Sequence, residues 1–180
     1  DGVNHPVSLY AATKRSNELI AHSYSHLYHI PSTGMRFFTV YGPWGRPDMA
    51  LFLFTKAIIN NEPISIFNNG KMKRDFTYID DIVDGLEQSI ELSKKNIINK
   101  HELFNLGNNS PVELENMIKL LENILGKKAK KRLVPMQLGD VKKTFADIKK
   151  SSKHLNFKPK ISLNEGLIKF VNWYKEYHKV

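Results

Sequence analysis

With 180 residues, of which 41% are hydrophobic and 11% aromatic, the chain can bury a sizeable core, which excludes a wholly disordered protein. The absence of cysteine excludes a disulfide framework, thiolate catalysis and cysteine-ligated metal sites, and it fits a reducing cytoplasm. No apolar run approaches the roughly 20 residues that span a bilayer, and no secretory signal pattern is visible, so we expect a cytoplasmic protein without a membrane partner.

The net charge of +9 is concentrated between residues 119 and 160, which hold 13 Lys and Arg residues and 3 Asp and Glu residues. A nucleic-acid or anionic-membrane surface is one explanation, but Arg132 is the only arginine of this stretch and few aromatic residues lie among its lysines. We interpret the stretch as a solvated lysine-rich surface that suits a nucleotide diphosphate. We expect no nucleic-acid partner.

Hydrophobic periodicity and turn residues predict alternating helices and strands along the first half of the chain. The first helix contains no Pro or Gly and is followed by Pro31, which stops it. Asp80 is predicted to cap the last helix of this half. The predicted elements are, in chain order, a helix over residues 8–28, a strand over 33–40, a loop over 41–47, a helix over about 48–60, a strand over 64–67, an extended piece over 74–78 and a helix from 80.

Two helices of the second half have clear start signals. Ser110-Pro111-Val112-Glu113 and Ser162-Leu163-Asn164-Glu165 each place a capping serine three residues before a glutamate. Gly126 is predicted to end the first of these helices. The remaining predicted elements are a strand over 103–107, a strand over 131–134 and a short helix near 147–154. The alternation of strands and helices predicts the α/β class.

Tyr10 and Lys14 are the strongest local signal for catalysis. Residues four apart on a helix share one face, so the Lys14 ammonium can lie beside the Tyr10 phenol. A free phenol has a pKa of about 10 and is almost un-ionised at neutral pH, whereas a cation about 5 Å away favours the phenolate. The pair can therefore supply a general base, although most Tyr and Lys pairs at this spacing lie on helix surfaces without a catalytic role.

Three motifs surround this pair and extend beyond it. They are His5 to Lys14 (HPVSLYAATK), Arg36 to Met49 (RFFTVYGPWGRPDM) and Arg74 to Asp81 (RDFTYIDD). In order and spacing they resemble the extended short-chain dehydrogenase/reductase family, and within it the UDP-glucuronate 4-epimerases. The resemblance implies an NAD-dependent nucleotide-sugar epimerase that interconverts UDP-glucuronate and UDP-galacturonate through a 4-keto intermediate.

The resemblance also implies which residues contact the cofactor. Tyr10 would be the catalytic base, and Lys14 would hold the nicotinamide ribose while it stabilises the phenolate. The strand over residues 34–40 would run beside NAD, with Phe38 and Val40 near the nicotinamide.

Four residues would contact the UDP-sugar substrate. Arg74 would pair with the diphosphate, and Asp140 would accept hydrogen bonds from the uridine ribose. Arg46 and Thr39 would recognise the C6 carboxylate of a hexuronic acid, because an unpaired buried carboxylate is costly. Without the resemblance, Arg74 and its neighbour Asp75 would be interpreted as a surface ion pair, and Asp140 as a turn residue. Arg46 would be a solvated loop residue and Thr39 an ordinary strand residue. Family members often carry Arg three residues before the aspartate, whereas this chain has Gln137.

No glycine-rich dinucleotide-binding turn occurs in the sequence, since Gly42-Pro43-Trp44-Gly45 contains a proline and no suitable helix follows it. In the resembling family, that turn and a Ser or Thr partner of the catalytic Tyr precede the position of Asp1. We therefore expect the later part of a Rossmann-type parallel sheet plus a small α/β substrate-binding lobe, without the N-terminal cofactor half, and a chain that is inactive alone. Residues 1–47 and 79–109 are assigned to the Rossmann-like part, and residues 48–78 and 110–180 to the lobe.

Several alternatives remain open at this point. Within the family they are a 4-epimerase of neutral UDP-hexoses, a 4,6-dehydratase and a decarboxylase, and outside it a module that merely holds UDP or a polyanion. Family members commonly dimerise through the Tyr–Lys helix, so a homodimer is expected. His22, His26 and His29 share a helix face, but the glutamate of a zinc protease motif is absent, and helix capping explains the acidic pair at residues 80–81. We therefore expect no metal site.

Overall fold

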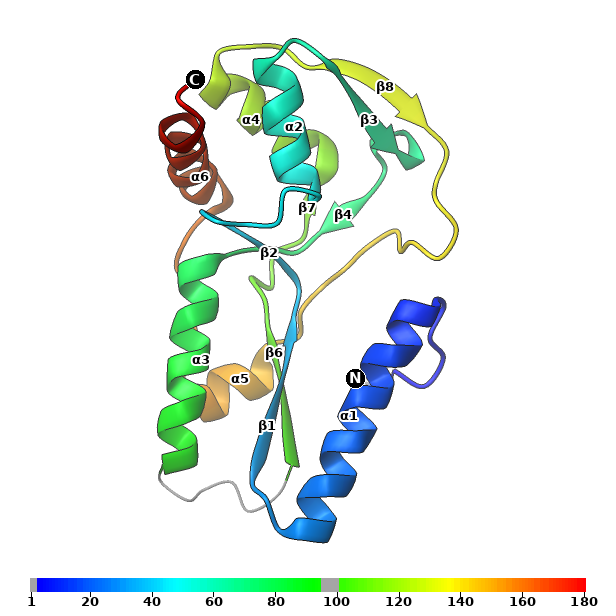
Figure 1. Cartoon of the computed structure of the whole chain (residues 1–180), viewed down its shortest axis with the longest axis vertical. Helices are drawn as coiled ribbons and strands as arrows, with labels where there is room; N and C mark the ends of the chain where they lie inside the picture. The colour runs from blue at the N-terminus through cyan, green and yellow to red at the C-terminus, as the bar shows by residue number, and fades with distance from the viewer. Residues whose placement is uncertain (1–2, 95–100) are drawn as a thin grey trace.

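Alternating helices and short strands form an elongated molecule, with α6 and the C-terminus near one end and the C-terminal end of α1 at the other (Figure 1). The computed structural model describes residues 3–94 and 101–180. Its elements are α1 (Leu9–Tyr28), β1 (Ser32–Phe37), β2 (Thr39–Tyr41), α2 (Ala50–Ile59), β3 (Pro63–Phe67), the short 3₁₀ helix η1 (Asn68–Gly70), β4 (Lys73–Arg74), β5 (Phe76–Tyr78), α3 (Ile79–Lys94), β6 (His101–Leu106), β7 (Val112–Glu113), α4 (Leu114–Leu125), β8 (Lys130–Val134), α5 (Lys149–Leu155) and α6 (Leu163–His178).

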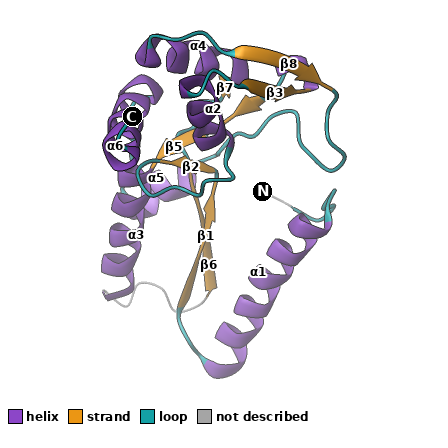
Figure 2. Ribbon diagram, turned by 45° about the horizontal axis from the view of Figure 1, so that its top comes forward, coloured by secondary structure: helices purple, strands orange, loops and turns teal. Residues whose placement is uncertain are grey.

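Parallel strand pairs form the framework of the fold. β1 pairs with β6, β2 with β5 and β3 with β8, all parallel, while β4 and β7 are antiparallel. In Figures 1 and 2, α1 lies on one side of the β1–β6 pair and α3 with α5 on the other. Parallel strands with helices between them in the sequence define the α/β class, so the predicted fold class is confirmed.

Two predicted strands are each divided, because the chain changes its pairing partner. The run over residues 33–40 is not one strand, since β1 pairs with β6 as far as Phe37 and β2 pairs with β5 from Thr39. The extended piece over residues 74–78 divides in the same way at Asp75, with β4 pairing to β7 and β5 pairing to β2.

The predicted helix cap at Ser110 is wrong, and the reason is also strand pairing. Val112 and Glu113 are extended as β7 against β4, and the Leu114 N–H donates to the Met72 carbonyl oxygen at 2.9 Å. α4 therefore begins only at Leu114, while its predicted end at Gly126 is confirmed, in the left-handed conformation (φ 66°) that favours glycine.

The predicted cap at Ser162 is confirmed, since its hydroxyl accepts the Glu165 N–H at 3.2 Å at the start of α6. Ser8, for which no cap was predicted, caps α1 in the same way and accepts the Ala11 N–H at 3.2 Å. Asp80 is not a cap, because α3 begins at Ile79 and Asp80 lies in its first turn. Its neighbour Asp81 is 3% exposed and accepts the N–H groups of residues 160 and 161 at 2.9 and 3.1 Å, which joins α3 to the segment before α6.

Two clusters of apolar side chains make the core. The large core joins α2, α4 and α6 to β2, β3 and β5, and Ile66, Met117, Leu121 and Leu167 are its fully buried centre. The small core joins β6, α3 and the segment around α5, and it consists of Ile82, Phe104, Leu106, Leu155 and Phe157. The predicted division into a Rossmann-like part and a substrate-binding lobe stays a prediction. Leu155 and Phe157, which that division assigns to the lobe, pack in the small core with residues assigned to the Rossmann-like part. No helix within residues 3–94 and 101–180 has the length and apolarity needed to cross a membrane.

Candidate active site

Tyr10 and Lys14 lie near the start of α1, one turn apart. The Lys14 Nζ atom lies 5.6 Å from the centroid of the Tyr10 ring, as the spacing predicted. Both side chains line a cavity of about 510 Å³ between α1 and β1, together with Gly34 and Phe37. Tyr10 is 71% exposed, so its hydroxyl is accessible to a ligand.

An ion pair that the sequence analysis missed holds α1 on the strand beneath it. The Arg36 fork donates to both oxygens of Glu18, from Nε at 2.6 Å and from Nη2 at 2.8 Å, and Arg15 adds a third bond at 2.7 Å. Hydrogen bonds from Arg36, opposed by burial and assisted by Arg15, lower the pKa of Glu18 to about 2. Glu18 lies one turn after Lys14, so helical spacing was the signal that placed it on the face of the catalytic pair.

A second cavity, of about 590 Å³, lies among α2, β3 and the β4–β5 segment. Three predicted substrate residues line it, namely Thr39, Arg74 and Asp140. The rest of its wall is largely apolar, with Leu53, Phe54, Ala57, Ile64, Phe67, Met72, Phe76 and Leu114 among its residues. An apolar cavity with a few convergent polar groups is typical of a small-molecule site.

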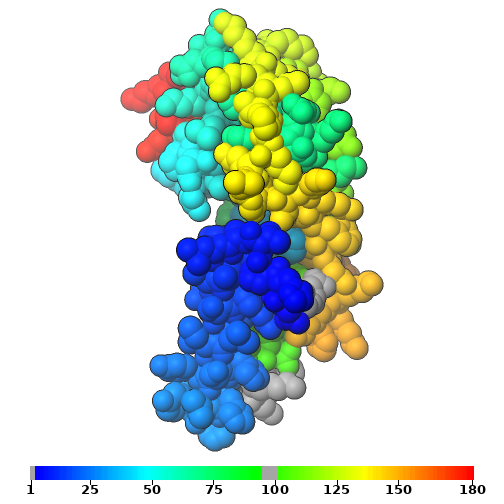
Figure 3. Space-filling model, turned by 90° about the vertical axis from the view of Figure 1, so that its right-hand side faces the viewer, coloured from blue at the N-terminus to red at the C-terminus, as the bar shows by residue number. Residues whose placement is uncertain are grey.

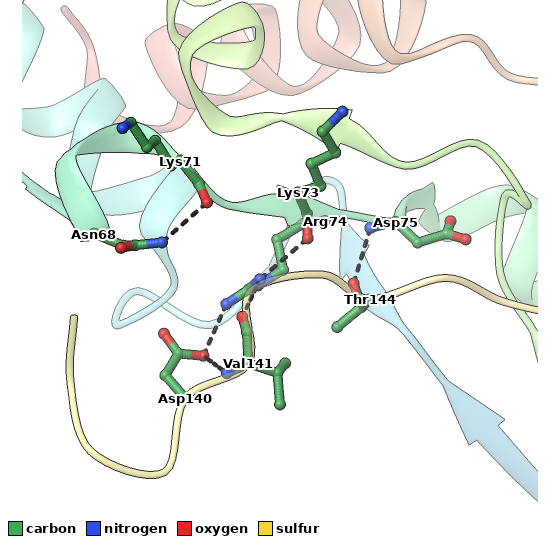
Figure 4. A network of polar contacts seen from close by, with 8 residues as sticks. All are labelled: Asn68, Lys71, Lys73, Arg74, Asp75, Asp140, Val141 and Thr144. Carbon is green, nitrogen blue, oxygen red and sulfur yellow. Dashed lines mark hydrogen bonds and ion pairs between the residues drawn. The ribbon is translucent and has the colours of Figure 1, made fainter.

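Arg74 and Asp140, 66 residues apart in the sequence, are bonded to each other in this cavity (Figure 4). Arg74 donates from Nη2 to Asp140 Oδ1 at 2.8 Å, and from Nη1 to the carbonyl oxygen of Val141 at 2.8 Å. Asp140 also accepts the Val141 N–H at 2.8 Å, inside the turn formed by the left-handed Gly139. Both side chains are mostly shielded, with 18% and 31% exposed. The structure thus brings a guanidinium and a carboxylate to one wall of the cavity.

Asp75, for which the sequence suggested only a surface pair with Arg74, holds this wall in place. It is fully buried and accepts the N–H of Asn108 at 2.7 Å and that of Ala146 at 2.9 Å. Its own N–H donates to the Thr144 hydroxyl at 3.1 Å, as Figure 4 shows. Asp75 therefore does not form the surface pair with Arg74 that its position next to that residue suggested, and it ties residues 144–146 to β5 instead.

The turn that carries Asp140 also lies against the start of α1. A Cβ at Gly139 would be 3.4 Å from the Ser8 Cβ and 3.7 Å from the Val7 carbonyl oxygen. In Figure 3 the dark-blue start of α1 lies directly below the yellow segment that leads towards α5. The contact places the Arg74–Asp140 wall next to the helix turn that presents Tyr10.

Arg46 lies on the loop after β2 and does not itself line the 590 Å³ cavity, but its partner Asp48 does. Arg46 donates to Asp48 from Nε at 3.0 Å and also from Nη2, and 75% of its side chain is exposed. The hydrogen-bonded carboxylate of Asp48 raises the pKa of Arg46, and Tyr10 acts in the same direction.

Phe38 and Val40 are not brought together with Tyr10 and Lys14 in the 510 Å³ cavity, which Phe37 lines instead. Phe38 lies between β1 and β2, where its ring would lie 3.1 Å from a Cβ at Gly107. Val40 packs beside the small core.

The histidines of α1 do not form a metal site in the described part of the chain. Among residues 3–94 and 101–180, no three His, Asp or Glu side chains are arranged to hold an ion. His22 packs edge-on against His101 with ring centroids 6.2 Å apart, and His29 ends α1 in a left-handed conformation (φ 54°).

Comparison with known proteins identifies the family. Residues 1–107 match the model of the NAD dependent epimerase/dehydratase family. The chain belongs to this family. It is 50% identical to Protein CapI of Staphylococcus aureus over 99% of its length, and 45% identical to a probable UDP-glucuronate 4-epimerase of Rhizobium meliloti over 99% of its length.

A solved epimerase structure has the same fold. The UDP-glucuronic acid 4-epimerase from Bacillus cereus, in complex with UDP-glucuronic acid and NAD, matches 96% of this chain with a TM-score of 0.90 and 40% identity. This chain covers 54% of that structure, and 58% and 57% of the two relatives, so it spans little more than half of their length.

The described residues include groups that fit a ribose of NAD, the cofactor named in the family description. The Tyr10 hydroxyl and the Lys14 ammonium line one cavity and form a donor set that suits the hydroxyl groups of a ribose. The 180 residues contain no glycine-rich turn of the kind that receives a pyrophosphate.

Proposed function

We propose that this chain is the C-terminal part of an NAD-dependent 4-epimerase that interconverts UDP-glucuronate and UDP-galacturonate. One observation carries the proposal. The turn bearing Asp140, which is bonded to Arg74, touches the first turn of the helix that presents Tyr10 and Lys14. A polar wall for a nucleotide diphosphate thus adjoins a candidate proton acceptor. The likeness to a structure that holds UDP-glucuronic acid and NAD supports it.

In this proposal the 590 Å³ cavity takes the UDP. The Arg74 guanidinium pairs with the diphosphate, and the Asp140 carboxylate accepts hydrogen bonds from the ribose hydroxyls. The backbone of β3 contacts the uracil. Arg74 and Asp140 are bonded to each other at 2.8 Å, so the nucleotide shares or replaces this hydrogen bond when it enters.

The chemistry takes place at C4 of the sugar. The Tyr10 phenolate oxygen accepts the proton of the C4 hydroxyl and returns it after the 4-keto sugar has rotated in the site to present its other face. The Lys14 ammonium stabilises the phenolate and holds the nicotinamide ribose. NAD, when bound, supplies the hydride acceptor and donor. Phe38, between β1 and β2, and Val40 of β2 are proposed to lie near the nicotinamide.

Arg46 and Thr39 are proposed to recognise the C6 carboxylate, because Thr39 lines the cavity and Arg46 pairs with another of its lining residues. In the longer protein that carries this chain, Arg46→Ala should lower kcat/KM for UDP-glucuronate at least about tenfold. The value for UDP-glucose, which lacks the carboxylate, should change little. The control is Arg132→Ala, which removes an exposed arginine of β8.

The same assays separate the alternatives. A wild type that prefers UDP-glucose favours a 4-epimerase of neutral UDP-hexoses, and loss of water from the sugar favours a 4,6-dehydratase. UDP binding without turnover favours a non-enzymatic module.

We also propose a homodimer that packs through α1. Its exposed aliphatic side chains, at 52–82% exposure, are Leu9, Leu19, Ile20 and Leu27. Such a surface is typical of a contact with another helix.

A further inference from the structure

One helix, α6, holds the loop between β2 and α2 at both ends. At the start of the loop, the buried Tyr41 hydroxyl packs so closely over Gly166 that a Cβ there has no room. After the loop, Phe52 of α2 packs edge-on against Phe170 and Tyr174, with ring centroids 6.5 and 5.1 Å apart. Since α6 is itself anchored in the large core, it forms a rigid support for this loop.

A third contact to α6 comes from the middle of the loop. The Trp44 ring lies 5.4 Å from the Trp173 ring and 5.0 Å from the Tyr177 ring, measured between centroids. Trp173 and Tyr177 are in turn stacked on each other at 5.5 Å with an interplanar angle of 17°. We call Trp44, Trp173 and Tyr177 the aromatic clamp.

The backbone of Trp44 indicates that the clamp fixes the loop. Trp44 has a φ of 60°, a left-handed conformation that bulky residues adopt only where surrounding contacts hold them. Its side chain is 73% exposed, so burial in a core does not explain its position. The ring contacts with Trp173 and Tyr177 of α6 therefore hold Trp44 in this conformation.

Arg46 follows Trp44 by two residues and depends on the same loop geometry. The Arg46 carbonyl oxygen accepts the Met49 N–H at 3.2 Å, and the Arg46 guanidinium is bonded to Asp48, which lines the cavity. The loop therefore contacts α6 through Trp44 and reaches the cavity rim through Asp48.

We propose that Trp44 is a positioning residue, which through Trp173 and Tyr177 sets the place of Arg46 and thereby the preference for a UDP-sugar with a C6 carboxylate. The choice of substrate rests on the proposed function above. The anchoring of the loop on α6 does not.

Hydrogen exchange in the longer protein tests the anchoring without any substrate. Tyr177→Ala removes one side of the clamp from an exposed position, and it should raise the exchange rate of the Gly45 and Met49 amides at least about fivefold. Ile168→Ala, which removes an exposed apolar side chain of the same helix, should leave both rates unchanged. Unchanged rates in Tyr177→Ala would overturn the clamp.

Kinetics test the positioning role. Trp44→Ala and Tyr177→Ala should each lower kcat/KM for UDP-glucuronate about tenfold, mainly through KM, and should change the value for UDP-glucose less than about twofold. Trp44→Phe keeps an aromatic ring and should restore most of the loss. In an Arg46→Ala background, Trp44→Ala should cost nothing further, since both changes act on one interaction.

Additive losses in the double variant, or equal losses on both sugars, would overturn the positioning role. A wild type without activity on UDP-glucuronate would instead refute the proposed function and the sugar preference built on it. The exchange rates would still decide whether the clamp anchors the loop.

Discussion

The Tyr10 hydroxyl is the group that exchanges the proton in the proposed chemistry. In the longer protein, Tyr10→Phe should reduce turnover at least about a hundredfold, because it removes the proton acceptor, while UDP-sugar affinity stays near that of the wild type. Lys14→Ala should weaken both turnover and NAD binding, since one ammonium serves the phenolate and the ribose. Turnover assays and calorimetric titrations measure these effects, with Tyr28→Phe on the same helix as the control. Near-normal turnover in Tyr10→Phe would refute the mechanism.

Glu18 makes the attachment of α1 to β1 sensitive to acid. Its pKa of about 2 lies below the usual value near 4.5, because Arg36 and Arg15 bond the carboxylate. A carboxyl whose pKa is depressed in the folded state stabilises the fold at pH values above its usual pKa. This contribution is lost as the pH falls from about 4.5 towards 2.

Thermal unfolding of the 180-residue chain between pH 2.5 and 7 tests this dependence. Glu18→Gln should lower the Tm at pH 6 to 7, and the difference from the wild type should shrink as the pH falls through 4. Glu87→Gln, at an exposed position of α3, is the control. A Tm difference that stays constant with pH would contradict the ionic origin of the contact.

Sequence patterns predicted single residues where the partners are close along the chain. A spacing of four placed Lys14 beside Tyr10, whereas Arg74 and Asp140 were assigned to one substrate only through the family resemblance. No local pattern shows that two residues 66 apart form a hydrogen bond. Asp75 was missed for the same reason, since its two N–H partners come from distant segments.

At the level of elements, prediction succeeded where the signal is local and failed where another segment competes. The Ser162 pattern marks the true start of α6, because its cap bond forms within one turn. The Ser110 pattern is equally good, yet residues 112–113 pair with β4 instead. A cap contributes about 1 kcal/mol, which tertiary pairing can outweigh.

Asp75 joins three segments of the chain, namely its own β4–β5 connection, the loop after β6 and residues 144–146, so we expect its replacement to loosen the substrate wall. Asp75→Asn should lower the free energy of unfolding by about 1–3 kcal/mol, because an amide has one acceptor oxygen and places an NH₂ group against a backbone N–H. UDP affinity of the longer protein should fall as residues 140–146 lose their attachment. Denaturant unfolding and calorimetry measure both, with Asp84→Asn at an exposed ion pair as the control. Unchanged stability would contradict the role of Asp75.

On the scale of the whole molecule, the chain exposes surfaces that α/β proteins usually cover. Among the described residues β1 pairs with β6 alone, whereas parallel sheets are normally extended and covered on both faces. The outer face of α1 exposes Leu19, Ile20 and Leu27 at 52%, 56% and 65%. These apolar side chains are exposed to water, and another helix or strand could cover them.

We therefore predict that the 180-residue chain by itself associates and does not bind NAD tightly. The exposed face of α1 favours contact between copies, and the pyrophosphate lacks a glycine-rich turn to receive it. Light scattering on a size-exclusion column should show species larger than the monomer of 20.8 kDa, and calorimetry should detect no micromolar NAD affinity. Replacing both Leu19 and Leu27 by lysine should shift the chain towards the monomer, because charge on this face opposes burial. A monodisperse wild-type monomer, or a micromolar dissociation constant for NAD, would show that these 180 residues already make a self-sufficient fold or cofactor site.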